Sequence, residues 1–292
     1  MKGIAFQHKG GRIVTSSIEH HAILNTCAFL ERMGYEVVYL PVDHQGLVSP
    51  AALESAITPD TLLVSIMMAN NEIGTVEPIK ELAAIAHTHG VLFHTDAVQA
   101  VGHIPVDVNA LGIDLLSASA HKFNGPKGTG FLYVRNGINI DPLLHGGGQE
   151  TGMRSGTENV AGIVGMSTAL EAHTRTISDD ASQLETLRSR LLAGLNGLDF
   201  IVNGGENHIP GSLSISFRGV EGEMLLHRLD LMGIAVATGS ACNSKDTVIS
   251  HVVRAIRVPD EYANGTIRIT LGMDNGEEQV DKIAASLRRI LK

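Results

Sequence analysis

The sequence predicts an α/β fold: a mainly parallel sheet covered by helices, followed by a smaller C-terminal α+β domain. In the first half of the 292-residue chain, short apolar runs of strand length alternate with helical patterns, which is the order that βαβ units produce. After residue 157 the pattern changes to long helices followed by short strands. We therefore expect a large domain over residues 1–174 and a small domain over residues 175–292.

The large domain opens with the end of a helix, which leaves through the glycine pair at residues 10 and 11. Its expected strands are residues 12–17, 35–42, 61–69, 91–97, 113–120 and 128–135. The run TLLVSIMMA is apolar throughout, which is typical of a strand buried on both faces. The expected helices are residues 20–33, 50–57 and 79–89, and the second of them has Ser49 as N-cap and Pro50 at its first position.

Two long helical patterns follow residue 157, and beyond them the small domain is expected to contain three short strands and a closing helix. The helical patterns cover residues 157–177 and 181–198, and the closing helix covers residues 277–291. The strands are expected at SLSISFR, GIAVATGS and TIRITLG. The chain contains neither internal repeats nor low-complexity linkers.

The composition excludes several classes of partner. The formal net charge is −9, which disfavours nucleic acid and anionic membranes, and 4% aromatic residues without Trp disfavour a base-stacking surface. No apolar run approaches the roughly 18 residues of a membrane span. The two cysteines, Cys27 and Cys242, lie far apart, so a reducing cytoplasm is the expected compartment.

Polar side chains follow three of the expected strands, at the point where each strand ends. Ligands bind at the carboxyl ends of the strands in open parallel sheets, so we expect these side chains to form one site. They are Asn71 after the third strand, Asp96 and Gln99 after the fourth, and Ser119, His121 and Lys122 after the fifth.

Lys122 and Asp96 together indicate pyridoxal phosphate (PLP). Enzymes that use it need a lysine to hold it as a Schiff base and a carboxylate to keep the pyridine nitrogen protonated. Taken singly, Lys122 could be a surface lysine and Asp96 a helix N-cap. Lys127 is a second lysine nearby, but Lys122 lies nearer the strand end. Gln99 suits a hydrogen bond to the phenolic oxygen of the cofactor, and Asn71 either does the same or closes a turn.

Two further residues allow both a structural and a functional interpretation. His20 starts a helix, where a histidine is often a cap, and an imidazole there could also stack on a cofactor ring and pass protons. Thr157 follows the glycine-rich HGGGQETGMRSG and precedes a long helix. Its hydroxyl and the neighbouring N–H groups could form an anion site, or the segment could be a plain loop with an N-cap.

The two cysteines differ in their surroundings. Cys27 lies on the apolar face of a helix, as a structural cysteine does, whereas Cys242 lies in the small, polar segment TGSACNSKD. A thiol in such a segment is exposed and can reach a substrate as a thiolate. Arg268, on an expected strand, is either an ordinary surface charge or a planar fork for a substrate carboxylate.

Seven segments together resemble the cysteine desulfurases of the NifS/IscS type, which belong to the aminotransferase class V group of fold-type I PLP enzymes. The likeness runs over essentially the whole chain in the family's order and spacing. The segments are EHHAILNTC, NNEIGTVEPI, HTDAVQAVG, SASAHKFNGPKGTGFLYVR, HGGGQETGMRSGTENV, TGSACNS and TIRITLG.

The resemblance implies a role for each of these residues and a sheet of the seven-stranded type. At the cofactor ring it implies Lys122 as the lysine bound to PLP, Asp96 at the pyridinium nitrogen, Gln99 and Asn71 near the phenolic oxygen, and His20 over the ring. At the phosphate it implies Ser119 and His121, with Thr157 at the phosphate of the partner subunit. At the substrate it implies Arg268 with Asn71, and Cys242 as the persulfide carrier. Family members begin earlier, with a Gly-Gly-Thr-Glu type loop that grips the phosphate, so the large domain is expected to be incomplete at its N-terminal part.

The activity implied by the resemblance is conversion of L-cysteine to L-alanine, with the sulfur left on Cys242 as a persulfide. An iron–sulfur scaffold or a tRNA-thiolation protein would accept that sulfur, and the chain would form a homodimer. Three alternatives remain open: an aminotransferase of the same fold, which would not need Cys242; a selenocysteine lyase; and a non-catalytic scaffold that binds sulfur-transfer partners.

Overall fold

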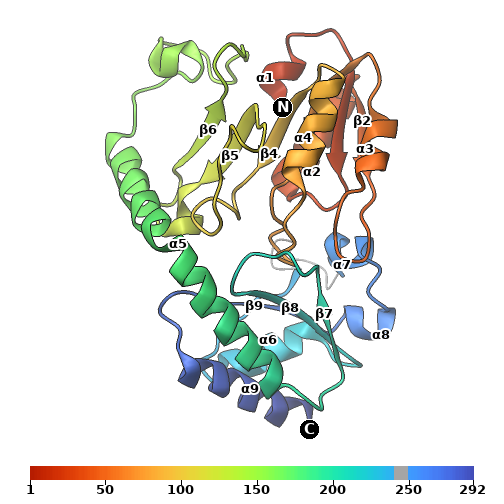
Figure 1. Ribbon diagram of the computed structural model, residues 1–292, viewed down its shortest axis with the longest axis vertical. Coiled ribbons are helices and arrows are strands. Elements are labelled where there is room, and N and C mark those ends of the chain that lie inside the picture. The colour runs from red at the N-terminus through yellow and green to blue at the C-terminus, as the bar shows by residue number, and fades with distance from the viewer. Residues whose placement is uncertain (240–248) are drawn as a thin grey trace. The chain divides into compact units, whose positions relative to one another are not determined.

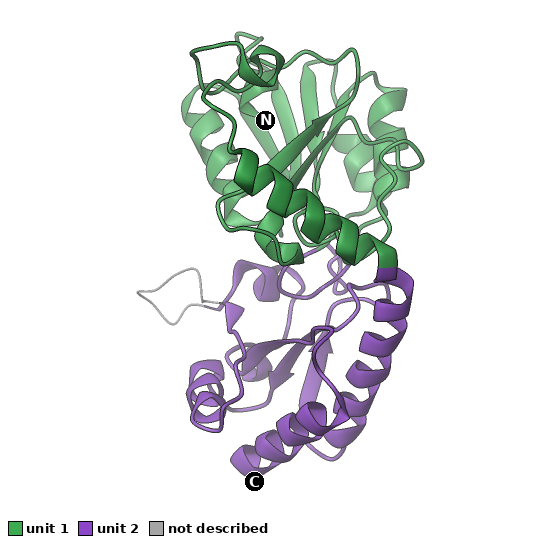
Figure 2. Ribbon diagram, turned by 90° about the vertical axis from the view of Figure 1, so that its left-hand side faces the viewer, with its two compact units in different colours: residues 1–41, 48–69, 77–175 green, residues 42–47, 70–76, 176–292 purple. Residues whose placement is uncertain are grey.

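The computed structural model describes residues 1–239 and 249–292, and the chain forms two compact units (Figure 2). The first unit contains residues 1–41, 48–69 and 77–175, and the second contains residues 42–47, 70–76 and 176–292. The two short segments that join the second unit follow the second and third strands of the chain. The sequence did not single them out, and the domain boundary between residues 174 and 175 stays a prediction.

The first unit is built on one six-stranded sheet in the order β2-β1-β3-β4-β5-β6 (Figure 1). All neighbouring strands are parallel except β5 and β6, which are antiparallel. The expected mainly parallel sheet flanked by helices is therefore confirmed, with six strands in the residues that the structure describes. The strands are β1 Arg12–Ser16, β2 Glu36–Leu40, β3 Thr61–Ser65, β4 Leu92–Asp96, β5 Leu115–Ser119 and β6 Gly130–Val134.

The central strands form where the sequence is most apolar. Leu63, Val64 and Phe93 are fully buried, as expected for strands covered on both faces. Each strand is shorter than its expected range, and the residues that follow β3, Ile66 to Ala69, stay buried although they lie outside the strand. The helices of this unit are α1 Lys2–Ala5, α2 His21–Arg32, α3 Pro50–Ala56 and α4 Ile79–Thr88, with 3-10 turns η1 Ala120–Phe123 and η2 Gln149–Gly152.

Helix α5, Val160–Gly194, is one continuous helix where the sequence predicted two. It begins in the first unit and ends in the second, because the division between the units falls after Arg175. The residues between the two predicted helices, Ser178 to Asp180, are polar but include neither glycine nor proline. Nothing in that segment breaks the backbone hydrogen bonds of a helix, so the two patterns join.

The second unit contains an antiparallel sheet in the order β7-β8-β9. Its strands are β7 Phe200–Asn203, β8 Ser212–Phe217 and β9 Thr266–Thr270, and its further helices are α6 Gly222–Asp230, α7 His251–Ala255, α8 Asp260–Ala263 and α9 Glu277–Leu291. Strand β7 was not predicted. The strand predicted at residues 233–240 is wrong for its described part, residues 233–239, which make only a single bridge between Ala237 and Arg268.

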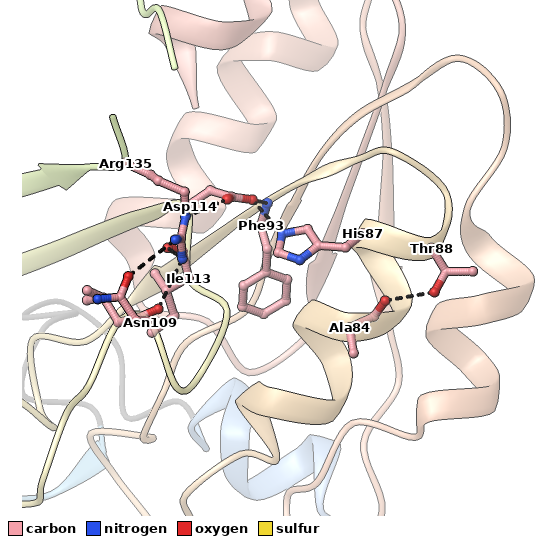
Figure 3. A network of polar contacts seen from close by, with 9 residues as sticks. Ala84, His87, Thr88, Phe93, Asn109, Ile113, Asp114 and Arg135 are labelled. Carbon is pink, nitrogen blue, oxygen red and sulfur yellow. Dashed lines mark hydrogen bonds and ion pairs between the residues drawn. The ribbon is translucent and has the colours of Figure 1, made fainter. Parts of the chain in front are cut away.

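A buried carboxylate fixes the amino ends of the strands in the first unit (Figure 3). Asp114, directly before β5, is 5% exposed. It accepts hydrogen bonds from His87 Nε2 at 2.8 Å, from Arg135 Nε at 3.2 Å and from the main-chain nitrogen of Phe93 at 2.9 Å. These contacts tie α4, β4 and the end of β6 to β5. They therefore set the register of the two strands whose opposite ends carry Asp96 and Ser119.

Candidate active site

Asp96 is the last residue of β4 and points its carboxyl group into a buried environment. The side chain is 8% exposed, and Oδ1 accepts a hydrogen bond of 3.0 Å from the main-chain nitrogen of Val98. Burial raises the pKa of Asp96, while the Val98 hydrogen bond and the interactions with His20 and Lys122 lower it. The three predicted residues therefore lie close enough for their charges to interact, although they come from three separate loops.

Lys122 lies within η1, the turn that follows β5, and is half-buried. Its main-chain carbonyl accepts a hydrogen bond of 2.8 Å from Nε2 of His103. The turn ends at Asn124, which has a left-handed conformation with φ 61° and ψ 17°. Asparagine tolerates that conformation better than most residues, so the sequence AHKFN suits a short turn that stops one residue after Phe123.

His20 is the N-cap of α2 and is exposed. Its Nδ1 accepts a hydrogen bond of 3.2 Å from the main-chain nitrogen of Ala22. An accepting Nδ1 leaves Nε2 as the nitrogen that carries a proton. The structural role that the sequence suggested, a helix cap, is thus present, and it orients the ring without using Nε2.

The two residues predicted at the phosphate contact each other. Ser119, at the end of β5, and His121 are joined by a hydrogen bond of 2.8 Å between Oγ and Nδ1. His121 is exposed and Ser119 is half-buried, so polar groups of both are accessible to a ligand. Gln99 is half-buried and lies in the turn that follows Asp96.

Thr157 lies outside the helix that it was expected to begin. Helix α5 starts at Val160, and Asn159 Oδ1 accepts a hydrogen bond of 3.1 Å from the main-chain nitrogen of Gly162. Asn159 therefore acts as the capping side chain. Thr157 is exposed in the loop before it.

Two predicted substrate residues lie together in the second unit. Nη1 of Arg268 donates a hydrogen bond of 2.7 Å to the main-chain carbonyl of Asn71. This contact is one of several that join the short segment 70–76 to the second unit. Cys242 lies outside the described residues.

The sequence analysis missed Glu19, the residue before His20. Glu19 is fully buried, and its Oε1 accepts hydrogen bonds from Ser16 Oγ at 2.7 Å and from the main-chain nitrogen of Met67 at 2.8 Å. Burial raises its pKa to about 8, and the neighbouring charge of Asp96 contributes to that rise. A glutamate between a buried strand and a helix cap was the available signal.

The sequence analysis also missed His94, which lies two residues before Asp96 on β4. Its Nδ1 is 2.8 Å from Ser65 Oγ and its Nε2 is 3.0 Å from Ser117 Oγ. Burial lowers the pKa of His94 to about 3, so the ring is neutral. Side chains two apart on a strand share a face, so this polar bridge across β3, β4 and β5 lies on the same face as Asp96.

The aminotransferase class-V family model matches residues 2–283. The cysteine desulfurase IscS of Dictyoglomus turgidum is 50% identical, and the alignment covers 100% of this chain and 75% of that protein. The cysteine desulfurase IscS of Methanosarcina thermophila is 51% identical, with 100% of this chain and 73% of that protein covered. A solved NifS-like protein is 42% identical with a TM-score of 0.92, over 99% of this chain and 78% of that chain.

The chain belongs to the aminotransferase class-V family. The solved apo structure of a cysteine desulfurase from Thermococcus onnurineus NA1 is also similar, with a TM-score of 0.87 and 25% identity over 99% of this chain and 75% of that chain. The chain therefore spans about three quarters of the length of the relatives that it matches.

PLP is the cofactor of this class-V chain, and the residues of the first unit fit it. An amine-bearing residue, Lys122, and a buried carboxylate, Asp96, lie within electrostatic reach of each other. A buried carboxylate near cations is suited to a protonated ring nitrogen, and accessible hydroxyl and imidazole groups are suited to a phosphate.

Two negative findings apply to residues 1–239 and 249–292. Within those ranges no helix is both long and apolar enough to cross a membrane. The same ranges contain no group of three or more His, Cys, Asp or Glu side chains arranged to hold a metal ion.

Proposed function

We propose that this chain is a PLP-dependent cysteine desulfurase that converts L-cysteine to L-alanine and takes the sulfur onto its own Cys242. The observation that carries the proposal is the convergence of Lys122, Asp96 and His20, which lie on separate loops and whose charges interact. The high identity to IscS proteins over the whole chain gives the substrate class.

Lys122 and Asp96 divide the work at the cofactor. When bound, PLP withdraws electrons from the substrate carbon that carries the amino group. The Lys122 amine would hold the cofactor, and as a free amine it would remove and return a proton at that carbon. The Asp96 carboxylate holds the proton on the ring nitrogen. Ser119 and His121 hold the phosphate, and Gln99 donates to the phenolic oxygen.

His20 moves protons at the sulfur and amine of the substrate. Its Nδ1 is occupied by the Ala22 main chain, so Nε2 is the nitrogen that exchanges protons. The half-buried Arg268 binds the substrate carboxylate with Asn71 beside it. A guanidinium has five N–H donors, and one of them suffices for the Asn71 carbonyl.

The thiolate of Cys242 accepts the sulfur. Its sulfur forms a bond to the substrate sulfur while the substrate C–S bond breaks, and the electron pair of that bond stays on carbon. A proton then converts this carbon to the methyl group of alanine. The product on the enzyme is a persulfide, which passes to a sulfur-acceptor protein such as an iron–sulfur scaffold or a tRNA-thiolation protein. We place this chemistry in the cytoplasm.

The chain acts as a homodimer in this proposal. Apolar side chains are exposed on both sides of Thr157 in the first unit, as expected for a surface covered by a second subunit. This placement supports a role for Thr157 at the phosphate of the partner subunit. The exposed residues are Leu143, Leu144, Met153, Val160, Ile163 and Val164.

Absorbance and product analysis of three purified proteins test the proposed function. The wild type incubated with PLP is expected to gain the visible absorbance band of a lysine-bound cofactor and to release alanine from cysteine. Lys122→Ala is expected to lose both, and Cys242→Ser to keep the band and lose alanine formation. Alanine formation by Cys242→Ser would contradict the sulfur-transfer role, and an unchanged band in Lys122→Ala would contradict the cofactor lysine.

A further inference from the structure

The turn that follows β4 packs directly against the turn that carries Lys122. Gly102 has φ +83°, and a Cβ atom built on it would lie 2.7 Å from Cβ of Phe123. Only glycine permits this approach without a shift of the backbone. The close approach places His103, the next residue, so that its Nε2 lies 2.8 Å from the main-chain oxygen of Lys122.

A second histidine extends this contact to helix α5. The rings of His103 and His173 meet edge to face, with centroids 6.1 Å apart and an interplanar angle of 63°. Nδ2 of Asn124 donates a hydrogen bond of 3.1 Å to Nε2 of His173. Both ends of the short segment from Lys122 to Asn124 are therefore held by imidazoles from other parts of the first unit.

The contact also defines the state of the His103 ring. A carbonyl oxygen can only accept, so Nε2 of His103 carries the hydrogen. Burial lowers the pKa of His103 and outweighs the rise that the hydrogen bond to the Lys122 carbonyl causes, while the neighbouring charges of His173 and Lys122 lower the pKa further. The ring is therefore an uncharged donor at neutral pH, which avoids a second cation beside the lysine.

We propose that His103 is a positioning residue for Lys122: its uncharged Nε2–H fixes the main-chain carbonyl of the lysine, while His173 fixes Asn124. The inference rests on the proposed role of Lys122 as the cofactor lysine. A lysine side chain has four rotatable bonds, so the place of its amine depends on a fixed main chain. His103 supplies that constraint without contacting the substrate.

The test compares side chains that keep or lose the donor. The glutamine of His103→Gln places an amide N–H near the position of Nε2 and does not titrate. The side chain of His103→Asn is too short to reach the carbonyl, and His103→Leu has no donor. His89→Leu is the matched control, because His89 contacts Glu54 at 2.7 Å at an exposed position.

Each protein is incubated with PLP between pH 6 and pH 10, and the Lys122 adduct is reduced with borohydride and quantified by peptide mass spectrometry. We expect His103→Gln and His89→Leu to match the wild type in rate and in the pH midpoint of labelling. We expect His103→Asn and His103→Leu to label Lys122 about five- to tenfold more slowly, as the loss of one hydrogen bond allows.

Hydrogen exchange without PLP gives a second readout. The main-chain nitrogen of Gly125 bonds to the carbonyl of Ala120 at 2.8 Å and closes the Lys122 turn. We expect faster exchange of Gly125 in His103→Asn and His103→Leu, confined to residues 120–125. Wild-type labelling and exchange in both variants would overturn the inference while leaving the cofactor lysine in place. Wild-type protein labelled elsewhere than at Lys122 would instead overturn the proposed site, and the inference with it.

Discussion

Replacement of Asp114 by alanine is expected to loosen the amino ends of β4 and β5. The carboxylate is 5% exposed and accepts from three donors, namely Nε2 of His87, Nε of Arg135 and the main-chain nitrogen of Phe93 (Figure 3). Alanine removes all three acceptor contacts at once. The side chains of His87 and Arg135 are 40% and 32% exposed, so water can replace the carboxylate for them.

The main-chain nitrogen of Phe93 is the costly partner, because it lies in the interior of the sheet. A buried N–H left without an acceptor costs ~1–3 kcal/mol. The two ion pairs involve partly exposed cations, and together they add about 1 kcal/mol. We therefore expect Asp114→Ala to lower the free energy of unfolding of the first unit by about 3 kcal/mol. Asp114→Asn keeps an acceptor for Phe93 and should cost about 1 kcal/mol.

Glu54→Ala is the matched control for Asp114→Ala. Glu54 contacts His89 at 2.7 Å, a distance similar to that between Asp114 and His87, but its side chain is 52% exposed. Its loss should change the free energy of unfolding by at most about 0.5 kcal/mol. Two compact units can unfold separately, so urea unfolding is followed together with hydrogen exchange at the Phe93 amide. Equal effects of Asp114→Ala and Glu54→Ala would refute the reasoning.

Three further predictions follow from buried groups. The folded pKa of Glu19 is about 8, above its unfolded value, so its contribution to stability is greatest below pH 4.5 and is lost as the pH rises towards 8. In urea unfolding, Glu19→Gln should lack this loss, whose slope is at most about 1.4 kcal/mol per pH unit. Parallel plots of unfolding free energy against pH for the two proteins would contradict the prediction. The folded pKa of His94 is about 3, below its unfolded value, so stability is lost as the pH falls below 6.5. Between pH 7 and pH 4, the thermal midpoint of His94→Gln should therefore fall less than that of the wild type. An equal fall in the two proteins would argue against a neutral buried ring. Leu287 is fully buried in the core of the second unit, and Leu287→Ala should destabilise that unit by about 2–5 kcal/mol in urea unfolding. Leu231 is exposed, so Leu231→Ala should have little effect. Similar losses of unfolding free energy in the two variants would contradict the assigned core.

The strands of the large sheet could be predicted because each coincides with an apolar run flanked by polar residues. The contacts that tie β4, β5 and the end of β6 together at Asp114 could not, since its partners His87, Phe93 and Arg135 lie on other elements of the sequence. The strand expected at residues 233–240 failed because apolar residues alone do not supply a pairing partner. Among the described residues of that segment only Ala237 pairs with β9, through a single bridge to Arg268, so the segment forms no ladder.

The candidate site was predictable in outline for a similar reason. Lys122 and Asp96 each follow a buried strand, and parallel strands bring their carboxyl ends to one edge. Glu19 had a sequence signal in its place between a buried strand and a helix cap, but its contact with Met67 could not be foreseen, and the role of His103 lies in its contact with Lys122, which is distant in sequence. The start of α5 was also predicted too early. Thr157 and Asn159 both suit an N-cap, and only the folded backbone shows that Asn159 caps the helix.

The buried acids of the first unit differ in the charges around them, and this difference assigns their roles. Glu19 has the carboxyl groups of Asp96 and Glu77 as charged neighbours, which together with burial keep its proton bound up to a pH of about 8. Burial raises the pKa of Asp96 too, but the Val98 hydrogen bond and the interactions with His20 and Lys122 lower it. Neighbouring groups therefore oppose the effect of burial at Asp96, whereas the carboxylates beside Glu19 add to it. This difference suits Asp96 to a protonated ring nitrogen, while Glu19 keeps its proton up to a pH of about 8 and accepts hydrogen bonds from Ser16 and the main chain of Met67.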